Sequence, residues 1–310
     1  MKSILSKAQF GKTGLGAQPG LRPPVAVEIS TDGVLAAAAP AAGQALVYAY
    51  EPLAAGVIEP SIGEPNVHNP DALAAALRSV LGQVPSRSRS VSLVLPDTTI
   101  RVFVLDFETL SPRPAEAMPV LRFRLRKTVP FDVEHAGVSY QILTEKKDEC
   151  RVLAAIIPGP VQAEYEAAVR AAGYEPGAVL SSSLAALAGI DSLESVLIAN
   201  LGRNALTTLI ANGNDLQLYR TVDLPQEPAQ HAAEVQRNIA VATAYYEDKL
   251  GARPTRLLYT GPESLDEFVR WIDDPELPVA ELAAHPETGY VTSAGPLSIA
   301  GVAGALAGAR

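Results

Sequence analysis

One pattern occurs twice in this chain, and it restricts the fold more than any other feature of the sequence. An apolar strand, a turn of small and polar residues and a second apolar strand span residues 25–39, and the same succession spans residues 196–210. Two aliphatic runs joined by a short turn are typical of a β-hairpin. A further strand and a helix follow each copy, which indicates a weak internal duplication and therefore two related lobes.

The two hairpin turns differ in sequence. The first is Thr31-Asp32-Gly33, after the strand VAVEIS, and the second is Gly202-Arg203-Asn204, after VLIANL. The second hairpin continues through Ala-Asn-Gly-Asn at residues 211–214 into a third strand. From the residues alone two interpretations stay open: an ordinary β-meander, or a pair of turns whose backbone N–H groups hold phosphate.

The stretch between the two copies has a different character. It contains a strand at 100–107, a helix at 114–129, two antiparallel strands around the charged turn 146–149 and an amphipathic helix at 161–173. We interpret it as an insertion into the first half. The predicted units are a leader at 1–24, a first lobe at 25–97 and 174–194, an inserted subdomain at 98–173 and a second lobe at 195–310.

Composition narrows the class of protein. The 310 residues are 48% hydrophobic and carry a net charge of -9, so we expect a globular chain that does not bind nucleic acid. A lone cysteine, Cys150, excludes an internal disulfide and fits a reducing compartment.

The leader is basic, and we expect either a mobile end or a weak tether to anionic lipid. The small-residue tract at 297–309 is too short to span a membrane and is expected to be a closely packed helix.

The segment RFRLRKTVPFDVEHAGVSYQIL, residues 122–143, resembles the inserted subdomain of PilM, the actin-like cytoplasmic protein of type IV pilus assembly. The matching positions are Lys127, Pro130, Phe131, Glu134, Tyr140, Gln141 and Leu143. The stretches AAGYEPGAVLSSSLAALAG, LYRTVDL and PLSIAGVAGALAG are also similar to that family. Related proteins are FtsA and the cytoplasmic part of the type II secretion protein GspL.

The resemblance implies an α/β, actin-like (ribonuclease H-like) fold with two lobes and an inserted α+β subdomain. In this superfamily, which includes actin, sugar kinases and heat-shock ATPases, the two turns face each other across a cleft. Their backbone N–H groups hold the phosphates of a nucleotide. The corresponding nucleotide site would comprise Ser30, Thr31, Asp32, Gly33, Gly202, Arg203, Asn204 and Gly261.

This sequence departs from the family at the residues that would bind magnesium. The family's Asp-Ile-Gly is Glu28-Ile29-Ser30 here, and its Asp-x-Gly is Asn200-Leu201-Gly202. The metal positions would therefore be Glu28 and Asn200. Glutamate adds a methylene in a tight site, and an amide carries no charge to offset Mg²⁺. Ser30 adds a side chain where the backbone should approach phosphate.

Two glycine pairs of the family are also replaced. Asp223-Leu224-Pro225-Gln226 follows Arg220, and Pro262 follows Gly261 where the adenosine would lie. We therefore expect a degenerate nucleotide site with no catalytic residue and no bound cofactor, and Mg·ATP is the alternative. Arg203 would pair with a phosphate or, as we favour, act as an exposed turn residue.

For function, the resemblance implies a cytoplasmic scaffold at the inner membrane of a type IV pilus or related secretion machine. It would dock the N-terminal peptide of a PilN-type membrane protein between the first subdomain and the insertion, and it allows homo-oligomers. The alternative is an active or nucleotide-gated ATPase in the same machine, with Glu28 replacing the aspartate and Asn200 positioning a water molecule. A sugar kinase ranks third because no catalytic base for a hydroxyl substrate is evident.

Overall fold

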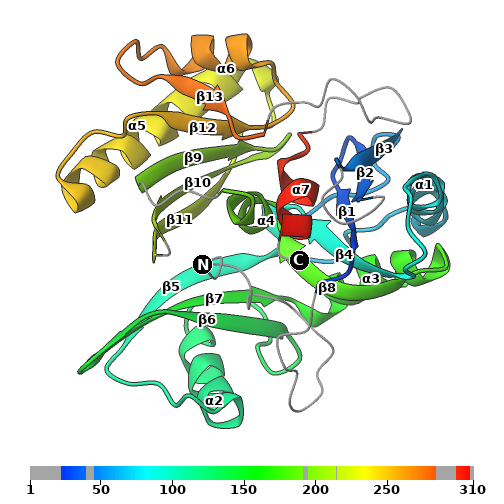
Figure 1. Ribbon diagram of the computed structural model, residues 1–310, viewed down its shortest axis with the longest axis horizontal. Coiled ribbons are helices and arrows are strands. Elements are labelled where there is room, and N and C mark those ends of the chain that lie inside the picture. The colour runs from blue at the N-terminus through cyan, green and yellow to red at the C-terminus, as the bar shows by residue number, and fades with distance from the viewer. Residues whose placement is uncertain (1–21, 40–44, 191–194, 214, 284–297, 308–310) are drawn as a thin grey trace.

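The computed structural model describes residues 22–39, 45–190, 195–213, 215–283 and 298–307 (Figure 1). Their strands form two five-stranded sheets and one three-stranded sheet. Residues 1–21 of the predicted leader lie outside the described residues, and so do both ends of the predicted helix 297–309. None of the helices in the described part of the chain combines the length and apolarity that crossing a membrane requires.

The first sheet is built around β1 (Val25–Ile29). This strand pairs antiparallel with β2 (Gly33–Ala38) on one side and parallel with β4 (Ser90–Leu95) on the other. β3 (Val47–Pro52) extends the sheet beyond β2, and β8 (Glu175–Ser181) extends it beyond β4. The resulting order is β3-β2-β1-β4-β8.

The second sheet repeats this arrangement around β9 (Ser195–Leu201). β9 pairs antiparallel with β10 (Ala205–Asn212) and parallel with β12 (Leu257–Thr260). β11 (Asp215–Asp223) and β13 (Val279–Glu281) complete the order β11-β10-β9-β12-β13. The two sheets therefore have the same strand order and the same directions, which confirms the internal duplication. The short strand β13 was not predicted, because its three residues carry no alternation.

The inserted sheet has the order β5-β7-β6, with β5 (Arg101–Phe107), β7 (Glu149–Ile157) and β6 (Gly137–Lys146). The helix α2 (Pro114–Leu125) packs on one face through Leu121 and Leu125, and Cys150 is buried in the same cluster. α2 ends four residues before the predicted end of the helix. The turn that follows is fixed by Thr128, whose N–H and hydroxyl both donate to the carbonyl of Leu125 at 2.8 Å.

The first half of the chain supplies three helices that accompany the first sheet: α1 (Pro70–Gln83), α3 (Gly159–Ala171) and α4 (Ser182–Ala188). α1 begins where Asn69 accepts the N–H of Ala72 at 3.0 Å, and Pro70 follows at the first helical position, where proline is favoured. α3 packs against α1 and β8. It therefore lies on the first sheet, whereas the predicted boundary at residue 173 groups it with the insertion.

The second sheet carries α5 (His231–Leu250), preceded by the short helix η2 (Pro228–Gln230), and α6 (Leu265–Ile272). Val235 and Ile239 of α5 and Phe268 of α6 are buried against the strands. The ring of Phe268 stacks on Tyr259 of β12 with centroids 3.8 Å apart. Both helices lie at the end of the molecule opposite α2 (Figure 1).

The last helix, α7 (Ala300–Ala307), crosses from the second half of the chain onto the first sheet. It packs against α4 and β1. A methyl group added at Gly304 would overlap the carbonyl oxygen of Ala185, and one added at Gly301 would overlap the carboxylate of Glu28. The small residues are thus required by close approach, as expected. α7 contacts the first lobe, although the predicted division places residues 195–310 in the second.

Candidate functional site

The two hairpin turns line one cavity between the lobes. Its volume is about 120 Å³. Nine of the ten residues proposed from the sequence line it, from both hairpins and from the end of β12: Glu28, Ser30, Thr31, Asp32, Asn200, Gly202, Arg203, Asn204 and Gly261. The hairpins therefore face each other across a shared cleft.

Two of the proposed glycines have packing roles. Gly33 does not line the cavity, and a methyl group there would lie 2.5 Å from the ring of Tyr50 on β3. Gly261 does line it, but a Cβ at that position would come within 2.9 Å of both the Cβ and the carbonyl oxygen of Leu201. Close contact with neighbouring strands therefore accounts for both glycines without a nucleotide.

The first turn uses its own donors internally. The N–H of Ser30 donates to the carbonyl of Gly33 at 2.9 Å, and the Ser30 hydroxyl donates to the same oxygen at 3.2 Å. The N–H of Asp32 donates to the Ser30 hydroxyl oxygen at 3.3 Å. The serine that replaces the family's glycine thus occupies an N–H group that a phosphate-binding turn would direct at its ligand.

Arg203 connects the two turns. Its Nε donates to Oδ1 of Asp32 at 2.7 Å, and its Nη2 contacts the same oxygen. The hydrogen bond and the charge of Asp32 raise the pKa of the Arg203 guanidinium. Arg203 is an exposed turn residue, as favoured from the sequence, and the ion pair with Asp32 is an additional contact that was not expected. Its side chain is 62% exposed, but it forms an ion pair between the lobes.

A second set of contacts joins the lobes deeper in the cleft, and we call it the interlobe cluster. At its centre is Asp97, in the short helix η1 (Asp97–Thr99) after β4. Its Oδ1 accepts the Ser183 N–H at 3.1 Å and the Tyr219 hydroxyl at 2.9 Å. Its Oδ2 accepts the Asn200 amide at 3.1 Å and the Ser183 hydroxyl. The cluster comprises Glu28, Asp97, Ser182, Ser183, Asn200 and Tyr219.

Glu28 lies at the edge of this cluster with one oxygen satisfied and one not. Its Oε1 accepts the hydroxyl of Ser182 at 2.6 Å, and its buried Oε2 has no hydrogen-bond partner among the described residues. Burial raises the pKa of Glu28 to about 7, the Ser182 hydrogen bond opposes that rise, and the charge of Asp97 adds to it. A large fraction of Glu28 is therefore neutral near pH 7.

Asn200 donates into the same cluster. Besides Asp97, its Nδ2 contacts the hydroxyl oxygens of Ser182 at 3.3 Å and Ser183 at 2.9 Å. An amide nitrogen can only donate, so this face of Asn200 offers nothing to a cation. It links β9 of the second lobe to the N-terminus of α4 in the first.

These groups do not fit a magnesium–phosphate complex. Mg²⁺ is held octahedrally by oxygen ligands, usually waters, phosphate oxygens and one or two carboxylates. Glu28 is partly protonated, both oxygens of Asp97 already accept two hydrogen bonds, and Asn200 directs its NH₂ group inward. Among the described residues no cluster of three or more His, Cys, Asp or Glu side chains is placed to hold a metal. The cavity is also smaller than the roughly 300–1,000 Å³ of typical small-molecule sites.

Four members of the cluster were missed from the sequence: Asp97, Ser182, Ser183 and Tyr219. A signal existed for Asp97, which follows Pro96 at the carboxyl end of a buried parallel strand, where functional groups gather in α/β sheets. Three serines in succession before an apolar run are typical of helix capping, and Ser181 does cap α4 by accepting the Leu184 N–H at 3.3 Å. The other two serines contact Glu28 and Asp97 instead.

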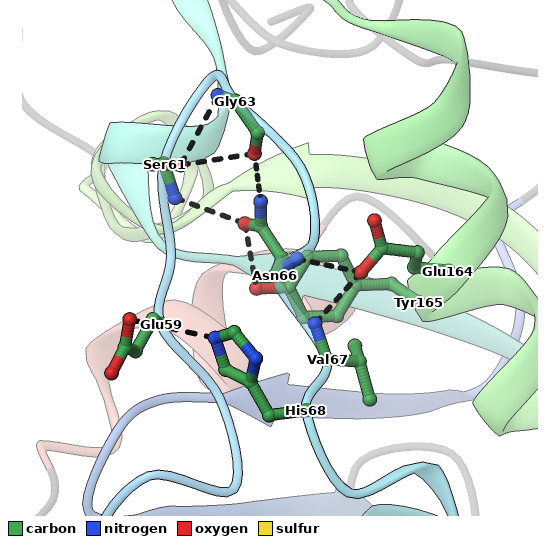
Figure 2. Close-up of polar contacts among 8 residues, drawn as sticks. All are labelled: Glu59, Ser61, Gly63, Asn66, Val67, His68, Glu164 and Tyr165. Atoms are coloured by element: carbon green, nitrogen blue, oxygen red, sulfur yellow. Dashed lines mark hydrogen bonds and ion pairs between the residues drawn. The ribbon is translucent and has the colours of Figure 1, made fainter.

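A polar network fixes the loop between β3 and α1, which supplies Pro60 to the wall of the cleft. Glu164 of α3 accepts the backbone N–H groups of Asn66 and Val67, both at 2.7 Å (Figure 2). The fully buried Asn66 accepts the Ser61 N–H at 2.9 Å and the Tyr165 hydroxyl at 3.3 Å. α3 thus holds this side of the cleft in place.

No protein-family model matches the chain, and no curated protein is similar to it in sequence. Its fold is similar to that of a chain in a solved PilM–PilN type IV pilus biogenesis complex. The two chains are 15% identical, and the match covers 94% of this chain and 100% of the other at a TM-score of 0.75. The cytoplasmic domain of EpsL, an inner-membrane component of the type II secretion system of Vibrio cholerae, is 16% identical over 88% of this chain and 90% of its own, at a TM-score of 0.49.

A Bacteroides thetaiotaomicron protein with an actin-like ATPase fold is 15% identical over 82% of this chain and 88% of its own, at a TM-score of 0.46. The α/β, actin-like fold expected from the sequence is confirmed, and so is the likeness to PilM at the level of the fold.

Proposed function

We propose that the protein is a PilM-like cytoplasmic scaffold, peripheral at the inner membrane, in a type IV pilus or related secretion machine. It docks an N-terminal peptide of a PilN-type membrane protein and no longer hydrolyses nucleotide. Two facts support this: the fold likeness to a chain from a PilM–PilN complex, and a cleft whose polar groups contact one another where magnesium and phosphate would be expected.

The observation that carries the docking proposal is on β6. Among the described residues this strand pairs only with β7, so its other edge is open to an added strand. Val138, Tyr140 and Ile142 pack toward α2, and the alternating Ser139 and Gln141 lie on the opposite face.

That opposite face is directed toward the main core. Ser139 and Gln141 pair with Ala155 and Leu153 of β7, and both of these belong to the core cluster of the first lobe. The Ser139 hydroxyl and Oε1 of Gln141 are buried, and within the described residues neither has a hydrogen-bond partner. Buried polar atoms of this kind are normally satisfied. An extended peptide added at β6 would pair with the backbone of this strand, and its side chains on the same face would reach the Ser139 hydroxyl and Oε1 of Gln141.

Calorimetry with the N-terminal peptide of a PilN-type protein from the same genome tests this proposal. We expect saturable binding, weakened about tenfold in a Ser139→Ala/Gln141→Leu variant because hydrogen bonds to the peptide are lost. Gln236→Leu, on α5 of the second lobe, is the matched control and should bind as the unmodified protein does. Absence of binding, together with no partner recovered by crosslinking, would refute the docking role.

A further inference from the structure

Exposed large apolar side chains lie on two surfaces at opposite ends of the molecule. Among the described residues they are Val120 and Phe123 on α2, at 46% and 61% exposure, and Val241 and Val269 on α5 and α6, at 51% and 43%. α2 lies on the outer side of the inserted sheet, and α5 and α6 lie at the far end of the second lobe (Figure 1). Neither pair contributes to the cleft or to β6.

The first surface is basic. Residues 113–127 contain five basic residues and one acidic residue, on a chain whose net charge is -9. Arg113 pairs with Glu116, Arg126 pairs with Glu134, and Arg122 donates to backbone carbonyls, which leaves Arg124 and Lys127 beside the apolar pair. The spacing of three and four residues places Val120, Phe123, Arg124 and Lys127 on one side of the helix, and we call these four residues the basic patch. The Lys127 ammonium lies 5.0 Å from the centre of the Phe123 ring.

The second surface is acidic. Residues 263–276 contain six acidic residues and one basic residue. Glu267 pairs with Arg270, and Asp274 and Glu276 pair with Arg253. Asp266 and Asp273 form no salt bridge within the described residues, and they flank Val269 at three and four positions along α6. We call Asp266, Val269 and Asp273 the acidic patch.

We propose that the basic patch of one copy docks on the acidic patch of the next, so that the protein self-associates head to tail. Each patch combines exposed apolar surface with adjacent charges of one sign, and the two signs are opposite, so the surfaces are complementary to each other and self-repelling. The two surfaces differ, so the contact is heterologous and its repetition produces a ring or an open filament. This inference is independent of peptide docking, because β6 is used by neither patch.

A partner other than a second copy would also have to be acidic to bind the basic patch. A second copy is favoured because the chain itself carries a surface that matches the basic patch. At the far end of the molecule, Val269 is exposed and the surrounding residues 263–276 have an excess of acidic side chains. Electrostatic complementarity of this kind sets partner choice and orientation.

Charge reversal tests the contact. Sedimentation velocity of the full chain over a range of concentrations should show self-association that weakens as salt is raised. Arg124→Glu/Lys127→Glu and Asp266→Lys/Asp273→Lys should each weaken it by at least about tenfold, because like charges then face each other. The matched control Arg87→Glu/Lys147→Glu reverses two exposed cations elsewhere and should associate normally.

The two reversed variants should associate with each other when mixed, because every contact in the mixture again joins opposite charges. Circular dichroism and peptide calorimetry on each variant separate a folding defect or a lost peptide site from loss of self-association. The proposal is overturned if the unmodified chain stays monomeric, if reversal leaves association intact, or if mixing the variants does not restore it.

Discussion

Arg203 in the second hairpin donates from Nε to Oδ1 of Asp32 in the first hairpin, at 2.7 Å. The pair joins the two turns that would otherwise receive phosphate between them. A cation from one lobe and an anion from the other therefore neutralise each other at the mouth of the cleft. Deeper in the cleft, Asn200 and Tyr219 of the second lobe donate to Asp97 of the first. The lobes are held together by contacts within the protein.

Arg203→Ala should loosen the hairpins with little effect on global stability. Since the arginine side chain is 62% exposed, the free energy of unfolding should fall by less than about 1 kcal/mol. Amide hydrogen exchange at both turns should increase, because the interlobe ion pair is lost. Arg113→Ala removes an exposed pair on α2 and should leave exchange at the turns unchanged. Equal exchange in both variants would show that the ion pair does not hold the turns together.

Asp97→Ala should destabilise the protein strongly. It removes the acceptor of four hydrogen bonds in a buried cluster, and we expect a loss on the order of 3 kcal/mol in the free energy of unfolding. Urea denaturation measures this. Asp106→Ala, which removes a largely exposed carboxylate on β5, should cost far less. The central role of Asp97 would be refuted by similar losses in the two variants.

Because of Glu28, the free energy of unfolding should fall as pH rises. Its pKa is about 7 in the folded protein against an ordinary value of 4.5, so between these values the folded state binds more protons than the unfolded state. The contribution to stability is therefore complete below about pH 4.5 and is lost as pH rises to about 7. Relative to Glu28→Gln, the unmodified protein should lose about 1 kcal/mol between pH 6 and pH 8. If the free energies of unfolding of the two proteins changed equally with pH, the burial of this carboxyl group would be refuted.

Two glycine substitutions should change the free energy of unfolding in opposite directions. Gly304→Ala places a methyl group against the Ala185 carbonyl where α7 meets α4, and overpacking of this kind costs about 1–3 kcal/mol. Gly82→Ala, in α1, adds a methyl group with no atom within 4 Å and should stabilise by up to about 1 kcal/mol. Urea denaturation of both variants measures the difference. A harmless Gly304→Ala would contradict the close packing of α7.

The fold could be predicted from the sequence because its defining features are local. The alternation of apolar residues around Asp32 and around Arg203 specifies two hairpins, and their repetition specifies two lobes. Boundaries between units were harder, since they depend on tertiary contacts. α7 is separated along the chain from the first sheet that it covers, and α3 lies between the inserted strand β7 and β8 of the first sheet, so its sequence position alone does not assign it to either unit.

Only part of the candidate site could be predicted from the sequence. The residues of the two turns could be aligned with a family pattern, and the structure brings nine of the ten together. Asp97 and Tyr219 were not recognised, because they are 122 positions apart and meet only after both sheets form. The ion pair of Arg203 was missed for the same reason, since its partner is 171 positions away.

The most direct measurement of the central claim is the melting temperature of the protein with ATP, with and without Mg²⁺, alongside Glu28→Ala. A ligand at 100 times its Kd would stabilise the folded state by about 2.7 kcal/mol. We expect no magnesium-dependent rise in the melting temperature at millimolar Mg·ATP, because the groups that would hold magnesium and phosphate are engaged with one another. A clear rise with Mg·ATP that disappears in Glu28→Ala would contradict this and indicate a nucleotide-gated ATPase.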